Sequence, residues 1–214
     1  MKVSKASKHI SRRERERLAH QNEILLAARE LFARDGFHDT TLDGIAHHAE
    51  FAKGTIYNYF SSKEDLFFTI IEQVLEGIQA IAESAVGIAH GDSREALTVY
   101  ARDLVGYCQE HSDLVRVIGR DLPRMDSQEH RARVKAIRRR HSRIVRTLAR
   151  PLLSDMRAGK LQSLDAEQVA FLFNGILNIY LMHRMSEQEA CGYKDIDQMV
   201  SLIVTLFFDG LERK

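Results

Sequence analysis

The sequence is poor in residues that interrupt helices or cross-link chains. It has two prolines, two cysteines and no tryptophan among 214 residues. So few prolines, and no regular alternation of valine or threonine with polar residues, argue against β-sheets and favour an all-α fold. Cys108 and Cys191 have neither metal-binding nor redox spacing. We interpret them as reduced structural residues of a cytoplasmic protein.

Long apolar runs and catalytic signatures are also missing. The longest apolar candidate, residues 169–182, is too short to span a membrane and is interrupted by Asn174 and Asn178. The N-terminus is basic, but no apolar segment follows it, so a signal peptide is not expected. The sequence contains no phosphate-binding glycine loop, zinc-binding helix motif, nucleophile elbow or paired-cysteine site. We therefore expect a soluble protein that is not an enzyme and uses no metal or cofactor.

Positive charge is concentrated at the N-terminus. The net charge is only +1, yet residues 1–20 hold seven lysines and arginines against two glutamates. A basic arm can follow the phosphate backbone of DNA or enter its minor groove. For the three lysines of residues 1–8, a disordered solubilising tail explains the charge equally well. For Arg12 and Arg13, contact with DNA is favoured over a role in a solubilising tail.

Residues 12–63 have the pattern of three helices with a tight turn between the second and the third. Apolar residues at helical spacing predict a first helix from about Arg12 to Arg34, which Gly36 is placed to end. Its apolar stripe consists of Leu18, Ile24, Leu25, Ala28, Leu31 and Phe32. Thr40 or Thr41 can cap the second helix. The third helix, within residues 52–58, is mostly polar, so it suits base reading in a helix-turn-helix better than packing.

The segment GTIYNYFSSKEDL at residues 54–66 resembles the signature of the tetracycline-repressor (TetR) family of transcriptional regulators. The resemblance extends through AARELF at residues 27–32 and covers about the first third of the chain. Further matches are Gly36-Phe37, Thr40-Thr41 and Ile45-Ala46. The resemblance implies a three-helix DNA-binding head on a larger helical body, which dimerises and usually binds a small effector.

Carried onto this sequence, the resemblance implies a set of DNA-contacting residues. These are Thr41, Lys53, Gly54, Thr55, Tyr57, Asn58, Tyr59 and Lys63. Thr41 and Lys63 would hold phosphates, and Lys53 could donate to guanine O6 or N7. Gly54 has no side chain, so the backbone can approach DNA closely there. For Tyr59, packing is favoured over base reading.

The turn before the third helix departs from the family pattern, which usually has a glycine, a small residue and a capping serine or threonine. This chain has Glu50, Phe51 and Ala52. Ala52 cannot cap a helix, which costs about 1 kcal/mol. Glu50 brings a negative charge close to DNA.

His47 and His48 are neighbours in the predicted second helix. Adjacent residues point to different sides of a helix, whereas a metal-binding pair needs a spacing of three or four. We interpret both histidines as neighbours of solvent or phosphate.

The rest of the chain predicts further helices over residues 63–85, 94–109, 112–122 and 128–149, with Pro151 kinking the last one or starting another turn. The last two helices, over residues 165–185 and 194–212, are the most apolar. A second copy of the chain is the simplest cover for them. The resemblance also implies a dimer through these helices, which would read a palindromic operator with half-sites one DNA turn apart.

Several polar residues occur within the apolar patterns of the body. They are Tyr100, His141, Asn174, Asn178 and His183. Each can be a hydrogen-bonded core residue or an effector contact. The nine basic residues of 131–150 surround an apolar stripe, so we interpret them as a solvated face rather than a second nucleic-acid site.

These observations predict three parts: a flexible basic arm (1–11), a helix-turn-helix domain (12–63) and a helical effector-binding and dimerisation domain (64–214). The predicted function is a homodimeric, sequence-specific transcriptional regulator, acting as a repressor that a small molecule releases. It would be cytoplasmic, and nucleoid-associated when bound to DNA. The alternative is an architectural or positional DNA-binding protein without an effector.

Overall fold

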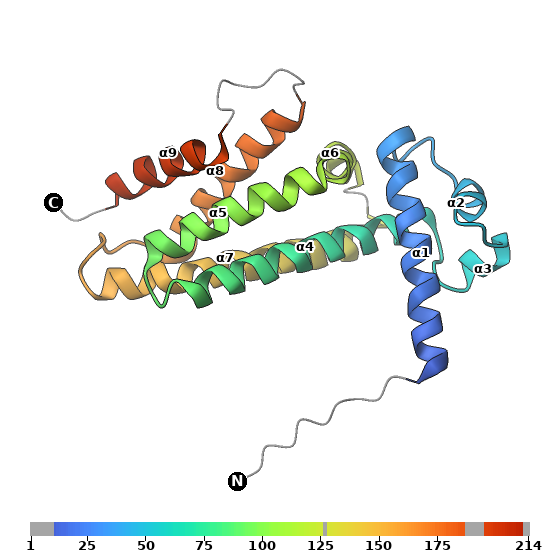
Figure 1. Ribbon diagram of the computed structural model, residues 1–214, viewed down its shortest axis with the longest axis horizontal. Coiled ribbons are helices and arrows are strands. Elements are labelled where there is room, and N and C mark those ends of the chain that lie inside the picture. The colour runs from blue at the N-terminus through green and yellow to red at the C-terminus, as the bar shows by residue number, and fades with distance from the viewer. Residues whose placement is uncertain (1–10, 126–127, 187–194, 212–214) are drawn as a thin grey trace, which may run out of the picture. The chain divides into compact units, whose positions relative to one another are not determined.

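The computed structural model describes residues 11–125, 128–186 and 195–211, and this part of the chain is all-α, as predicted. It contains nine α-helices, one 3₁₀ helix and no strand (Figure 1). The chain divides into two compact units, residues 1–70 and 71–214, here called the head and the body. The division falls within α4 (Lys63–Ile88), whose first turns belong to the head.

The head consists of α1 (Arg12–Asp35), α2 (Leu42–His48), α3 (Lys53–Tyr57) and the start of α4. Ser11 caps α1, and Gly36 ends it with a positive φ of 87°, as its position predicted. The core of the head consists of buried side chains from all four helices and from the segment between α3 and α4: Ile24, Phe32, Ile45, Ile56, Phe60 and Phe67. Leu18 was predicted to belong to the buried apolar stripe of α1, but it is 42% exposed, and all of residues 11–20 are exposed as well.

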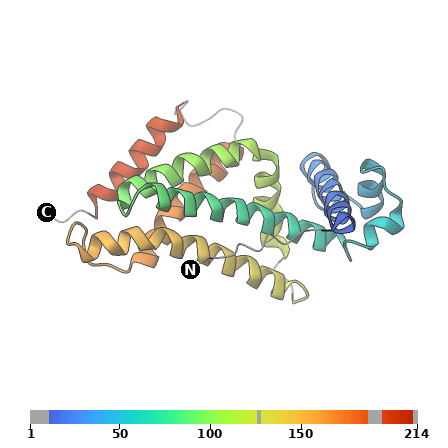
Figure 2. The same cartoon turned by 60° about the horizontal axis from the view of Figure 1, so that its bottom comes forward.

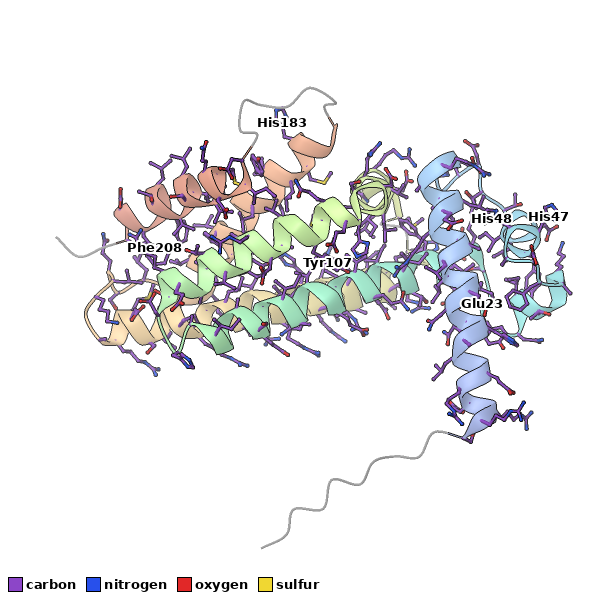
Figure 3. The ribbon with its side chains drawn as sticks, viewed as in Figure 1. Glu23, His47, His48, Tyr107, His183 and Phe208 are labelled. Atoms are coloured by element: carbon purple, nitrogen blue, oxygen red, sulfur yellow. The ribbon has the colours of Figure 1, made fainter. Side chains whose placement is uncertain are left out.

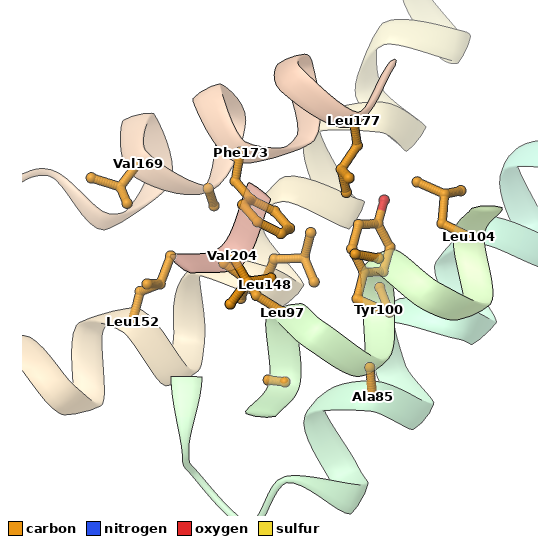
Figure 4. Packing of buried hydrophobic residues seen from close by; sticks show 14 of the residues in the cluster. Ala85, Leu97, Tyr100, Leu104, Leu148, Leu152, Val169, Phe173, Leu177 and Val204 are labelled. Carbon is orange, nitrogen blue, oxygen red and sulfur yellow. The ribbon is translucent and has the colours of Figure 1, made fainter. Parts of the chain in front are cut away.

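The body contains the rest of α4 together with α5 (Ser93–Glu110), α6 (Ser112–Asp121), η1 (Leu122–Met125), α7 (Arg131–Arg157), α8 (Ala166–Ser186) and α9 (Ile196–Asp209). Figures 1 and 2 show α4 and α7 running alongside each other, with α5 beside α4 and α9 against α5. Arg140 of α7 donates to Glu76 of α4 at 2.7 Å. Leu97, Leu148 and Phe173 come from three helices and are fully buried in one apolar core (Figure 4).

Pro151 lies inside α7, which continues to Arg157. Ala158 is the C-cap of the helix, and Gly159 follows it with a φ of 75°. The amides of Gly159 and Lys160 donate to the carbonyls of Met156 and Asp155 at 3.1 and 3.0 Å. This closes the final turn with hydrogen bonds.

Aspartates cap the last two helices. The Asp165 carboxylate accepts from the amides of Glu167 and Gln168 at 2.9 and 3.1 Å. Asp195 accepts from the amide of Asp197 at 2.9 Å before α9.

Some predictions lie outside the described residues, namely the basic arm over residues 1–10, Cys191, and the ends of the last helix at Lys194 and Glu212. Cys108 is buried and unbonded, as expected for a structural thiol, and burial raises its pKa to about 11. Within the described ranges no helix has the length and apolar character needed to cross a membrane.

Candidate nucleic-acid interface and effector cavity

The second helix begins at Thr41, which settles the choice between the two threonines. The Thr41 hydroxyl accepts from the Gly44 amide at 3.0 Å. Thr40 is buried instead, and its hydroxyl donates to the Gly36 carbonyl at 2.7 Å. One threonine therefore caps α2 while the other fastens the preceding turn to the end of α1.

The turn between α2 and α3 is built on Glu50, which has a φ of 57°. The Glu50 amide donates to the His47 carbonyl at 3.2 Å, and the Phe51 amide donates to the Ala46 carbonyl at 2.9 Å. This pattern ends a helix in a left-handed residue, which glycine adopts most easily. Ala52 precedes α3 without a side-chain cap, as predicted. The sequence departure at this turn thus corresponds to a strained backbone position.

The third helix turns only Ile56 into the core. Lys53, Gly54, Tyr57 and Asn58 are exposed, and Thr55 is half-buried. Half of the Tyr57 surface is accessible, at 50%. A short helix with one buried anchor and an exposed polar face has the geometry that base reading requires.

Lys53 has a partner that the sequence interpretation missed. Its Nζ lies 2.6 Å from Asp43 Oδ2, across the turn on α2, and both side chains are about 60% exposed. The hydrogen bond and the negative charge of Asp43 raise the pKa of Lys53. No local signal in the sequence indicates this pair, because the two residues are ten positions apart.

Lys63 and Tyr59 both make contacts within the head. The Lys63 ammonium donates to the carbonyls of Phe37 and His38 at 2.7 and 3.0 Å and lies 4.5 Å from the centre of the Phe37 ring. The Tyr59 hydroxyl lies 3.3 Å from His20 Nδ1. An ammonium has three donors, so Lys63 retains one for a phosphate.

The two adjacent histidines of α2 lie on different sides of the helix, as expected. Figure 3 shows His48 on the side towards α1 and His47 on the outer side. His48 Nε2 is 2.6 Å from Glu30 Oε2 of α1. Among the residues that the structure describes, no group of three metal-ligating side chains comes together.

The body contains a cavity of about 500 Å³. Its walls are mostly aliphatic side chains from α4, α6 and α8, among them Ile71, Val74, Ile78, Val115, Ile118 and Leu181. The polar lining groups are Arg138, His141 and Ser142 of α7 and Asn178 of α8. An apolar space of this size with a few polar groups is typical of a small-molecule site.

Two of the five predicted effector residues, His141 and Asn178, line this cavity. Tyr100 and Asn174 lie behind it, joined to His141 by hydrogen bonds. The Tyr100 hydroxyl donates to Asn174 Oδ1 at 2.7 Å, and Asn174 Nδ2 lies 2.9 Å from His141 Nε2. His183 is exposed near the C-terminal end of α8 and does not line the cavity (Figure 3).

The basic face of α7 is not only solvated, because some of its residues pair with α4 or line the cavity. Most of its arginines are exposed, but Arg140 is half-buried, and it pairs with Glu72 and Glu76 of α4 at 3.4 and 2.7 Å. Arg138 and Ser142 border the cavity, and sequence reasoning did not select them. The two residues are four positions apart and therefore lie on the same side of α7, and this spacing could have identified them from the sequence.

Comparison with known proteins identifies the head. The sequence profile of the bacterial regulatory proteins of the tetR family matches residues 24–70. The transcriptional regulator YfiR of Bacillus subtilis is 44% identical over 66 residues, which are 30% of this chain and 32% of YfiR. The regulator HbdR of Aromatoleum is 34% identical over 82 residues, 38% of this chain and 36% of HbdR. The matched part thus spans about a third of the length of these curated relatives.

Solved structures share the fold over nearly the whole chain. The fatty acid degradation regulator FadR of Bacillus halodurans superposes with a TM-score of 0.75 at 22% identity, covering 91% of this chain and 97% of FadR. FadR of Bacillus subtilis, solved with stearoyl-CoA, gives a TM-score of 0.73 at 22% identity over 88% and 98% of the two chains. Residues 24–70 thus match the tetR family of bacterial regulatory proteins, and the chain shares the all-helical fold of these solved regulators.

Proposed function

We propose that this protein is a sequence-specific DNA-binding transcriptional regulator that reads its operator with α3. The observation that carries the proposal is the exposed polar face of α3, held by the single buried anchor Ile56. Lys53, Tyr57 and Asn58 would contact bases and phosphates in the major groove, and Gly54 would let the backbone approach. Thr41 and Lys63 would hold phosphates on either side, with Thr55 and Tyr59 completing the interface.

The protein would bind DNA as a homodimer through α8 and α9. Large apolar side chains are exposed at helical spacing on α8, namely Leu172 at 61%, Ile176 at 44% and Ile179 at 74%. On α9, Leu202 and Leu206 are 40% and 66% exposed. Scattered exposed leucines are common, but an apolar stripe along a helix favours a protein partner. A two-fold dimer would separate the two reading helices by one DNA turn, about 34–36 Å.

The regulator would act as a repressor that a small effector releases. The body cavity supports this, and so does the stearoyl-CoA held by the similar FadR of Bacillus subtilis. An effector that binds better to the DNA-free form shifts the population away from DNA, and by linkage DNA weakens effector binding by the same factor. The protein would work in the cytoplasm and would not be an enzyme.

The decisive experiment selects bound fragments from a random DNA pool at two salt concentrations. The native protein runs beside a Lys53→Ala, Tyr57→Ala double variant. We expect an enriched palindrome that the double variant loses and that added salt weakens. Salt-sensitive binding without an enriched motif would support the architectural alternative instead. No binding at all would overturn the DNA-reading function.

A further inference from the structure

One hydrogen-bonded chain of polar side chains runs through the apolar core of the body to the cavity. It starts at Tyr100, which is 0% exposed and lies near Leu97, Leu104 and Leu177 in Figure 4. It continues through Asn174, which is 3% exposed, and ends at the half-buried His141. Buried phenol and amide groups are costly unless paired. The buried polar groups of Tyr100, Asn174 and His141 therefore stay hydrogen-bonded only while all three residues keep their partners.

The direction of these hydrogen bonds determines the tautomer of His141. Asn174 Oδ1 accepts from the Tyr100 hydroxyl, so the amide nitrogen Nδ2 is the atom that faces His141. An amide nitrogen only donates. His141 Nε2 must therefore be the acceptor, and the ring hydrogen resides on Nδ1. Burial lowers the pKa of His141, because it disfavours the charged form of the ring.

The N–H of His141 is available to a ligand. His141 lines the cavity, and no acceptor for its Nδ1 occurs among the residues that the structure describes. Arg138 and Asn178 also line the cavity and have further N–H groups. Among the described residues that line the cavity, none is an aspartate or a glutamate. A cavity with apolar walls, N–H donors and no anion suits a ligand that brings an acceptor oxygen rather than a cation.

We propose that His141 donates its Nδ1–H to a carbonyl oxygen of an otherwise apolar effector, with Asn174 and Tyr100 as positioning residues that hold the tautomer. The ligand class is a ketone, ester or thioester with a hydrocarbon chain. This inference rests on the proposed effector site. A hydrocarbon of the same shape leaves the donor unpaired, so the cavity discriminates against it.

The test uses two probes of the same shape: methyl hexyl ketone, and its analogue in which a methylene group replaces the oxygen. Binding is measured by displacement of the dye anilinonaphthalene sulfonate from the full-length protein. We expect His141→Phe to weaken the ketone about tenfold and to leave the hydrocarbon within about twofold. His183→Phe, at an exposed histidine of the same unit, should change neither affinity.

The outcomes separate the two proposals. If both probes bind but His141→Phe weakens them equally or not at all, the role of His141 is wrong while the cavity remains a ligand site. If neither probe binds the native protein, the effector site fails and the inference fails with it.

A measurement on the native protein avoids any question of folding. Nitrogen NMR of ¹⁵N-histidine-labelled protein distinguishes the two tautomers, and we expect His141 to carry its hydrogen on Nδ1. The ketone should shift that resonance. Asn174→Leu should release the ring to the other tautomer and weaken the ketone without removing the imidazole. A hydrogen on Nε2 in the native protein would overturn the proposal.

Discussion

The head and the body use polar side chains in opposite ways. In the head, Lys53 and Tyr57 lie exposed on a five-residue helix, where water and, for Lys53, the exposed Asp43 carboxylate satisfy their polar groups. In the body, Tyr100 and Asn174 are buried and satisfy each other. The exposed groups therefore add little to the free energy of unfolding and are suited to binding, whereas the buried pair affects both stability and the shape of a cavity.

The two regions also differ in the sequence distance over which their sites form. The residues proposed to contact DNA lie within the short segment 41–63, so their spacing is a recognisable pattern. Tyr100 and Asn174 are 74 positions apart, and Asn174 and His141 are 33 apart. Such a site exists only after helices have packed, which is why the sequence suggested its members singly and not as a chain.

The largest expected effect is on the packing of the body. Leu152 and Leu153 are neighbours on α7, but Leu152 is 0% exposed and Leu153 is 40% exposed. Leu152→Ala should lower the free energy of unfolding by about 3 kcal/mol, because it removes buried methyl groups and leaves a cavity. Leu153→Ala should cost less than about 1 kcal/mol. Urea unfolding followed by circular dichroism measures both, and equal losses would contradict the assigned core face of α7.

The buried polar pair should show strong coupling. Tyr100→Phe leaves Asn174 Oδ1 without its donor and should cost about 2 kcal/mol. Replacing both residues, as Tyr100→Phe with Asn174→Leu, removes the unpaired groups together and should cost less than the sum of the single changes. Tyr57→Phe in the head is the matched control and should stay within about 0.5 kcal/mol. Additive losses in the double-mutant cycle would mean that the two side chains do not interact.

Local patterns predicted the helices of the head closely, because caps and turns are written in neighbouring residues. Thr41 and Gly36 mark two of these boundaries as expected. The prediction placed Leu18 in the apolar stripe, but α1 has no neighbour covering its first turns in the described chain, so spacing alone overstated its burial. At Pro151 a local rule allowed either a kink or a new turn, and α7 continues. The pairing of Lys53 with Asp43 required the turn geometry and was missed.

That missed pair gives a smaller, more specific prediction. Asp43→Asn removes the carboxylate that holds Lys53, so the freed ammonium can pair with phosphate. Affinity for unrelated DNA should rise several-fold, the salt dependence should steepen by about one phosphate contact, and preference for the operator should fall. Fluorescence anisotropy with operator and scrambled duplexes over a salt series measures all three.

Asp35→Asn is the control for this change, because it removes another exposed carboxylate of the head, the one paired with Arg34. It should leave the preference for the operator unchanged. If Asp43→Asn behaves like Asp35→Asn, Asp43 does not position Lys53 for base reading.

The smallest expected effect concerns the turn between α2 and α3, where the sequence departs from the family pattern and Glu50 has a positive φ. Glu50 adopts a left-handed conformation that disfavours a residue with a Cβ atom. Glu50→Gly relieves this strain but also frees the unfolded chain, so the net gain should be about 0.5 kcal/mol. Asp39→Gly, at an exposed position without a positive φ, should destabilise the head instead. Hydrogen exchange of the α1 and α2 amides reports on the head alone.

Glu50→Gln separates strain from charge at the same position. It keeps the left-handed backbone and its strain but removes the negative charge beside the proposed DNA interface. If Glu50 repels phosphate, both Glu50→Gln and Glu50→Gly should raise DNA affinity, while only the glycine variant stabilises the head. A glycine variant that gains stability without gaining affinity would show that Glu50 affects the turn and not the DNA. In that case the head tolerates strain at its turn for reasons independent of operator binding.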